Sequence, residues 1–217
     1  SGPRRADEAT SEKRGHLIAC FAATAKRNSP CIRSETAAMV NNIESTVAST
    51  RVRLARNLAG YPFPNRLEPA AGKEIVRTVS EEACLLHPFK LYSMDEIAEN
   101  VAQSLCDDHL ISSELASNLA CGAALIDEEG EGEDGPRGKY SVMINEEDHL
   151  REQYIIRGLN LMLAYRRLSA FDDGLSRSLR FAFDNKLGYL TACPTNLGTG
   201  LRASVMLFLP GLTRTKK

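Results

Sequence analysis

The sequence lacks the features that mark several common classes of protein. Its 217 residues contain no apolar stretch that approaches the length of a membrane span. The 27 basic and 28 acidic side chains nearly cancel, so net charge predicts neither a nucleic-acid partner nor a membrane partner. No internal repeat is visible. Any electrostatic attraction to a ligand must therefore come from a local cluster of charged side chains.

Paired cysteines and metal-binding patterns are also missing. The six cysteines include no CxxC pair, and their spacing matches no zinc template. A chain that is 43% hydrophobic has enough material for a core and does not need disulfides. We therefore expect free thiols, a reducing compartment and a cytoplasmic protein without a metal site of its own.

What is present predicts one domain behind an N-terminal lead-in. Residues 1–46 show no clear periodicity, and we expect them to be poorly ordered, with the domain itself over 47–217. The segment 49–67 begins like a strand and closes in a loop rich in Pro, Gly and Asn. Residues 68–119 then carry a mainly helical pattern.

The second half alternates strands with one long helix. A hairpin is expected, with its first strand ending near Ile126 and the next beginning near Tyr140. A long amphipathic helix is expected after Arg151, and two strands flank the loop 191–204. This order predicts an α+β fold, an antiparallel sheet flanked by helices that pack on one face.

The first cluster that can carry chemistry is "STRVRLAR". In a strand, residues i and i+2 point to the same side, so Arg51 and Arg53 are expected to project together. Two neighbouring guanidinium groups repel each other unless an anion lies between them, and arginine forms bidentate hydrogen bonds with phosphate oxygens. The alternative is a polar strand face with solvated arginines.

The second cluster is "NEEDHLR", which we expect at a transition from strand to helix. Glu146, Glu147 and Asp148 lie beside His149 and Arg151. A carboxylate near a guanidinium substrate can orient it and accept its proton. The alternative is that these acidic residues cap a helix and interact with its dipole.

The third cluster is the loop "TACPTNLGTGLRAS". Gly198 and Gly200 allow a close approach of the backbone to a ligand, and Arg202 follows at the start of a strand. Arginines near the Cys193 thiol favour its reactive form. The alternatives are a buried apolar thiol and a simple Gly/Pro turn.

Together the three clusters predict a phosphotransferase that uses a nucleotide. Several converging arginines suit a polyphosphate, and phosphoryl transfer depends on charge neutralisation and in-line positioning. Neither the Walker motif GxxxxGK[ST] nor a kinase-type glycine loop is present, which disfavours the two commonest ATP-binding folds. The enzyme is therefore expected to be of an unusual type.

The motifs "STRVRLARN", "NEEDHLR" and "CPTNLGTGLRAS", in this order, resemble those of the guanidino kinases. "DDHLIS" and "LARNLAGYPFP" are most similar to the bacterial protein-arginine kinase branch of that family. The resemblance implies ATP-dependent transfer of a phosphoryl group to the guanidinium of arginine, with Mg²⁺ carried by the nucleotide. It favours arginine residues in proteins as acceptors.

The resemblance also implies a role for each matched residue. Glu147 is implied as the catalytic base that holds the guanidinium, with Glu146 and Cys193 beside it. The implied ATP-binding residues are Ser49, Thr50, Arg51, Val52, Arg53, His109, Arg151, Arg202, Ala203, Ser204, Val205 and Met206.

Other expectations concern the extent of the domain and its partners. The family's catalytic domain extends past the last expected strand, so we expect a catalytic domain shortened at its C-terminus. Two other functions stay open, a remnant that binds only ATP or a partner, and a kinase of free arginine or another small guanidino compound. Expected partners are proteins with exposed arginines, a regulatory protein, and a second copy paired at an uncovered sheet edge.

Overall fold

The computed structural model describes residues 46–130, 137–210 and 214. The lead-in expected over 1–46 lies outside these residues except for its last position. The expected α+β fold, an antiparallel sheet flanked by helices, is confirmed by the elements that follow.

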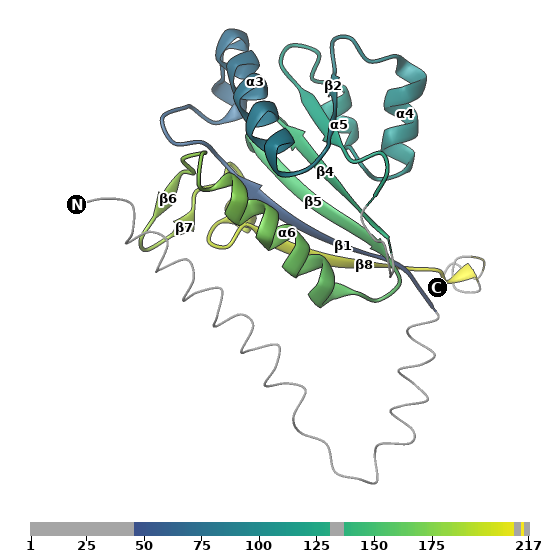
Figure 1. Cartoon of the computed structure of the whole chain (residues 1–217). Coiled ribbons are helices and arrows are strands. Elements are labelled where there is room, and N and C mark those ends of the chain that lie inside the picture. The colour runs from purple at the N-terminus through teal and green to yellow at the C-terminus, as the bar shows by residue number, and fades with distance from the viewer. Residues whose placement is uncertain (1–45, 131–136, 211–213, 215–217) are drawn as a thin grey trace.

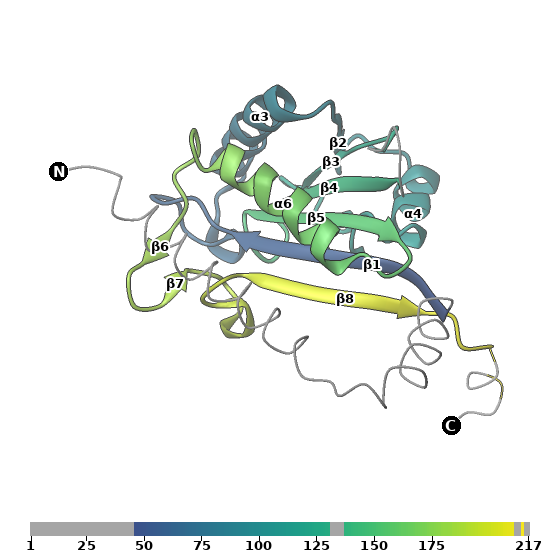
Figure 2. The same ribbon diagram turned by 60° about the horizontal axis from the view of Figure 1, so that its bottom comes forward.

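The centre of the fold is a six-stranded sheet in the order β2-β3-β4-β5-β1-β8, and every neighbouring pair is antiparallel. The two long strands β1 and β8 run side by side along its lower edge in Figure 2. The strands are β1 (Val47–Arg56), β2 (Lys90–Ser93), β3 (Ala123–Ile126), β4 (Gly138–Ile144), β5 (Leu150–Arg157) and β8 (Leu201–Leu207).

Helices cover both faces of this sheet, so the expectation that they pack on one face is wrong. The helices α3 (Pro69–Leu86) and α6 (Leu161–Leu175) lie in front of the sheet in Figure 1 and share one core cluster with it. The shorter α4 (Glu99–Asp107) and α5 (Ser113–Ala116) contribute to a second cluster on the opposite face. The site described below lies on this second face.

Alternation along the strands decides which side chain meets which layer. Val52 and Leu54 of β1 pack with α6, and Met143 of β4 packs with α4 and α5. Side chains of a strand alternate between the two faces of a sheet, so Arg53, which lies between Val52 and Leu54, points away from α6. The remaining elements are a small hairpin of β6 (Phe183–Asp184) and β7 (Gly188–Tyr189), and two 3₁₀ turns, Pro64–Arg66 and Pro194–Asn196.

A helix was expected directly after Arg151, but the first residues of that segment form a strand. β5 continues to Arg157, and α6 begins only at Leu161. Leu150, Tyr154 and Ile156 enter the core at even spacing because β5 is paired on both sides, by β4 and by β1. This pairing overrides a local pattern that also fits a helix. The short strand β2, within the expected helical segment, is a second departure.

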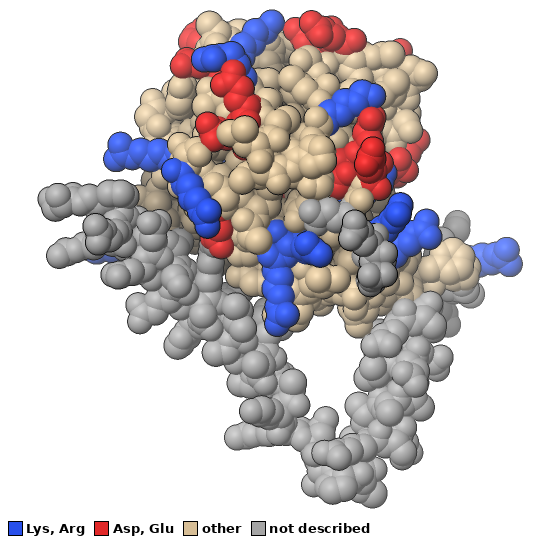
Figure 3. Space-filling model, in the orientation of Figure 1, with Lys and Arg blue, Asp and Glu red and all other residues tan. Residues whose placement is uncertain are grey.

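The surface shows no dominant charge of one sign on the face seen in Figure 3, where basic and acidic side chains lie interspersed. Within the described part of the chain, no helix combines the length and the apolar character needed to cross a membrane.

The buried face of α6 allows a direct test of its packing against the sheet. Leu168 is wholly buried, whereas Leu163 on the same helix is 37% exposed. We expect Leu168→Ala to lower the free energy of unfolding by about 2–5 kcal/mol, because it leaves a cavity against the sheet. Urea unfolding measures the change. Leu163→Ala is the matched control, with a change of about 0.5 kcal/mol or less, and equal losses from both variants would contradict the packing of α6.

Candidate functional site

Three strands place arginines on the sheet face opposite α6. Arg53 of β1 lies directly opposite Arg202 of β8 and Gln153 of β5. Residues opposite each other in an antiparallel pair share a face. Arg51 lies two residues before Arg53, and both line one hollow, which confirms that they project together. Arg151 reaches the same hollow from β5.

Burial and the neighbouring arginines both disfavour the charged forms of Arg51 and Arg53. Burial, and then repulsion from Arg51, Arg151 and Arg202, lowers the pKa of Arg53 to about 10. Burial lowers the pKa of Arg51 as well, and repulsion from Arg151 and Arg202 adds to that effect. Arg53 is only 7% exposed, and its Nε has no hydrogen-bond partner among the described residues. Such a cluster of cations is suited to an anion with several charges.

The arginines line two hollows. The first, here the arginine hollow, has a volume of about 320 Å³ and is lined by Arg51, Arg53 and Arg151 together with Cys106 and His109. His109 adopts a left-handed backbone conformation, with φ at 60°. The structure therefore brings the predicted His109 beside the predicted arginines.

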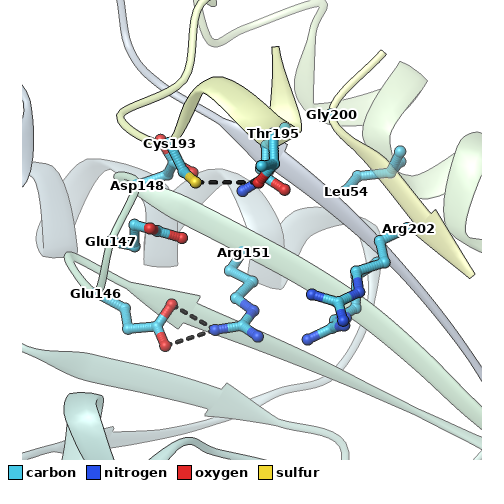
Figure 4. A pocket seen from close by; sticks show the side chains of 12 residues that line it. Leu54, Glu146, Glu147, Asp148, Arg151, Cys193, Thr195, Gly200 and Arg202 are labelled. Carbon is cyan, nitrogen blue, oxygen red and sulfur yellow. Dashed lines mark hydrogen bonds and ion pairs between the residues drawn. The ribbon is translucent and has the colours of Figure 1, made fainter. Parts of the chain in front are cut away.

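The second, here the central hollow, has a volume of about 250 Å³. Figure 4 shows Glu147 between Cys193 and Glu146 along one wall, with the guanidinium groups of Arg151 and Arg202 facing them. All three sequence clusters thus contribute to one cavity. Thiol, carboxylates and guanidinium groups lie around it.

The motif "NEEDHLR" forms a hairpin turn between β4 and β5, so its expected place at a transition from strand to helix is wrong. Helix capping is therefore not its role. Asn145 opens the turn with φ at 58°, a conformation that asparagine tolerates better than most residues. Glu146 accepts two hydrogen bonds from Arg151 Nη1, of 2.5 and 2.7 Å, and orients that guanidinium. The exposed Glu147 carboxylate has no hydrogen-bond partner among the described residues.

The turn is tied to the loop that carries Cys193. Asp148 Oδ1 accepts hydrogen bonds from Asn57 Nδ2 at 2.6 Å and from the backbone N–H of Ala192 at 2.7 Å. Asp148 is 2% exposed, and burial makes such charge-assisted hydrogen bonds strong. The half-buried Cys193 Sγ lies 3.0 Å from Thr195 Oγ1. Asp148 therefore sets the position of the thiol relative to Glu147.

His149 is a buried structural residue. Its Nδ1 accepts a hydrogen bond from the N–H of Leu58 at 3.0 Å, and Nε2 lies 2.9 Å from the carbonyl oxygen of Pro62. This pattern fits the neutral ring with its proton on Nε2. Burial lowers the pKa of His149, although hydrogen bonding to Pro62 and the charge of Asp148 oppose the change.

The sequence places Arg56 in the first cluster, but its role in holding the loop that carries Cys193 was not predicted. Arg56 is fully buried and forms paired hydrogen bonds with Asp172 of α6, at 2.8 and 2.9 Å. Its Nη1 donates to the carbonyl oxygen of Thr199 at 2.9 Å. Asn57 was likewise missed. The alternation of "RVRLAR" identifies Arg56 as a residue of the core face, but nothing local indicates Asp172, 116 positions later.

The other predicted nucleotide-binding residues divide between the two faces. The register places Ser49, Ser204 and Met206 on the face of the arginines. Thr50 and Val52 are buried on the opposite face, where Thr50 Oγ1 donates to the carbonyl oxygen of Gly158. Ala203 and Val205 lie opposite Val52 and Thr50 and share that face. The side chains of these four residues point away from the two hollows.

Among residues 46–130, 137–210 and 214, no three or more His, Cys, Asp or Glu side chains form a group that could hold a metal ion.

Comparison with known proteins places the chain beside one group of phosphotransferases. Residues 71–217 match the ATP:guanido phosphotransferase, C-terminal catalytic domain. A protein-arginine kinase of Pelotomaculum thermopropionicum is 42% identical over 177 residues, which cover 79% of this chain and 48% of that protein. A protein-arginine kinase of Clostridium novyi is 44% identical over 183 residues, covering 82% and 51%. The chain thus spans about half the length of the curated relatives it matches.

A solved structure shows the same likeness. The duplicated taurocyamine kinase of Schistosoma mansoni, with bound transition state analog components, superposes with a TM-score of 0.69 at 30% identity. The match covers 80% of this chain and 25% of that one.

The environment of His149 predicts how stability depends on pH. Its folded-state pKa is lower than the ordinary value of 6.5, so the unfolded chain takes up the proton first as the pH falls. The free energy of unfolding should therefore be highest above pH 6.5 and decrease as the pH falls below it. Urea unfolding between pH 8 and pH 5 measures this slope. His149→Gln should flatten it and the exposed His109→Gln should not, and an unchanged slope in His149→Gln would rule out this residue as its origin.

Proposed function

The chain belongs to the ATP:guanido phosphotransferase family, and from this we propose that it transfers the γ-phosphoryl group of ATP to the guanidinium of arginine residues in proteins. The observation that carries the proposal is the cluster of Arg51, Arg53, Arg151 and Arg202 beside the carboxylate of Glu147. The arginines repel one another in the absence of an anion. A nucleotide polyphosphate would remove that repulsion.

In the proposed reaction a guanidinium nitrogen of the acceptor attacks the γ-phosphorus. A P–N bond forms as the bond between the γ-phosphorus and the bridging oxygen breaks, and ADP leaves. The attacking nitrogen loses a proton, which the Glu147 carboxylate accepts. Arg53, Arg151 and Arg202 stabilise the charge on the transferring phosphoryl group. Mg²⁺ would enter with the nucleotide phosphates, and its charge would add to this neutralisation.

Two supporting residues prepare the acceptor site. Glu146 fixes Arg151 through its paired hydrogen bonds, so Arg151 keeps one orientation toward the central hollow. Asp148 holds the backbone of Ala192, and Cys193 follows directly. We propose that Cys193 lies beside the acceptor guanidinium and helps to orient it. The arginine hollow, with His109 on its wall, would receive the rest of the nucleotide.

The proposal that the acceptor is an arginine residue in a protein is based on the similar proteins. The relatives at 42% and 44% identity are named protein-arginine kinases, whereas the structural neighbour at 30% identity is a taurocyamine kinase, named for a small guanidino compound. The higher identity favours arginine within proteins. Free arginine as acceptor, or nucleotide binding without transfer, are the outcomes that the experiments below separate from this proposal.

Glu147→Gln should abolish phosphoryl transfer, because the amide cannot accept the proton. The expected loss is at least about 10²–10⁴-fold. Purified protein is incubated with Mg-ATP and an unfolded, arginine-rich protein, and phosphoarginine is scored by mass spectrometry as acid-labile phosphate. ATP affinity should stay nearly unchanged. Glu74→Gln, which removes the same charge from an exposed position of α3, is the matched control.

The outcomes of this assay are distinct. Transfer by Glu147→Gln at the original rate would refute the role of Glu147 as base. In a parallel incubation free arginine takes the place of the protein, and phosphoarginine formed only there would replace the protein acceptor by a small one. ATP binding without any transfer would leave a nucleotide-binding function only.

Arg51→Ala should weaken ATP binding roughly 10- to 100-fold, because it removes charge-assisted hydrogen bonds to the phosphates. It should also raise the melting temperature without nucleotide, since a source of repulsion is gone. Titration calorimetry and thermal unfolding measure the two effects. Arg66→Ala, at an exposed position away from the site, should change neither, and unchanged ATP affinity in Arg51→Ala would contradict the phosphate-binding role.

A further inference from the structure

A third hollow, here the acidic hollow, adjoins the central one. It has a volume of about 470 Å³ and shares Glu146, Glu147 and Arg151 with the central hollow. Its other walls are Ser112, Glu114 and Asn118, at and beside α5, and Asn145 of the turn. None of the steps proposed above uses this space.

Several side-chain donors on its walls are engaged with the protein. Arg151 is bound to both oxygens of Glu146. Ser112 Oγ donates to Glu146 Oε1 at 2.6 Å, and Asn118 Nδ2 donates to the carbonyl oxygen of Asn145 at 2.8 Å. These contacts occupy Arg151 Nη1 and the Ser112 hydroxyl, so fewer hydrogen-bond donors than acceptors face this hollow.

Acceptors, in contrast, remain available. Asn145 is wholly buried, and its Nδ2 donates to the carbonyl oxygens of Gly72 and Cys121, but its Oδ1 has no partner among the described residues. Glu114 and Glu147 are exposed at this hollow. Three carboxylates and one guanidinium on the walls give a local charge of −3 + 1 = −2. A buried acceptor without a donor is costly, and a cation rich in N–H groups supplies what is missing.

We infer that the acidic hollow is a subsite for a second basic side chain of the acceptor polypeptide, a lysine or arginine close in sequence to the arginine that is phosphorylated. This inference depends on the proposed function, because it places the reacting guanidinium in the central hollow beside Glu147 and Cys193. The two hollows share three wall residues, so neighbouring side chains of one peptide reach both. Glu114 is the charged residue of the subsite that belongs to neither the central hollow nor the turn.

Glu114 also lines the arginine hollow, which gives a competing role in nucleotide binding. The two roles predict different kinetic effects. A nucleotide contact changes the KM for ATP with every acceptor, whereas a peptide subsite changes the preference among acceptors. The experiment must therefore measure both quantities.

The test uses peptides with a single arginine and one lysine, which is placed in turn at each position within three residues of that arginine. The same peptides with glutamine or glutamate in place of the lysine are compared with them. Lysine fills the subsite without being a second guanidino acceptor. For at least one spacing we expect kcat/KM to be roughly 3- to 5-fold higher with lysine, the upper part of the range for an exposed ion pair. The preference should decrease with added salt.

Two substitutions assign the preference to this hollow. Glu114→Gln should reduce the lysine-to-glutamine ratio below twofold, and Glu114→Lys should reverse it in favour of a glutamate neighbour. Glu74→Gln should leave the ratio as it is. Equal kcat/KM for all peptides, or a ratio that Glu114→Gln does not change, would overturn the subsite. A higher KM for ATP with every peptide would assign Glu114 to the nucleotide instead.

Failure of the subsite and failure of the kinase function are distinguishable. Phosphoarginine on all peptides without preference leaves the kinase function intact and rejects the subsite. If no peptide is phosphorylated, fluorescence anisotropy of the labelled peptides still tests the subsite. Tighter binding of the lysine peptides, lost in Glu114→Gln, supports it, and equal binding rejects it.

Discussion

The buried pair of Arg56 and Asp172 is the interaction on which the geometry of the site depends. A charge without a partner in this position would cost several kcal/mol, yet Arg56 is surrounded by partners. It binds both oxygens of Asp172, the carbonyl oxygens of Ala55 and Thr199, and the face of the Tyr189 ring, 3.6 Å from its guanidinium carbon. One side chain thus joins β1, α6 and the loop before β8. That loop places Arg202 at the start of its strand.

The loop can approach Arg56 only because residue 200 is glycine. Its φ is +63°, and a Cβ there would lie 2.5 Å from the carbonyl oxygen of Ala55 and 2.7 Å from Arg56 Nη1. The backbone of Gly200 also accepts the hydrogen bond of the Ala55 N–H, at 2.9 Å. Gly200 therefore allows the backbone of the loop to lie close to a buried arginine. Gly200 also lines the central hollow, and its close approach to a ligand stays a prediction.

The pKa values of two arginines in β1, Arg53 and Arg56, shift in opposite directions. Burial lowers the pKa of Arg56, but the charge of Asp172 and its hydrogen bonds outweigh that effect and raise the pKa. For Arg53, burial and neighbouring arginines act in the same direction, and the pKa decreases to about 10. The sequence shows three arginines in one motif without this distinction.

Period-2 alternation predicted that Arg51 and Arg53 share a face, since it is a local property of any strand. Local patterns could not predict contacts between distant segments. These include the ion pair with Asp172, the hydrogen bond of Asn57 and the pairing of β5 on both sides.

Alternation in β1 has a consequence for how this segment can change in evolution. Odd-numbered residues from Arg51 to Ala55 face the hollows, and even-numbered residues from Val52 to Arg56 face α6. β1 is paired on both sides, by β5 and by β8. Inserting or deleting one residue here would exchange the two sets, with guanidinium groups entering the core and leucine entering the site. A substitution in this strand alters one contact at a time, whereas a change in its length displaces every side chain that follows.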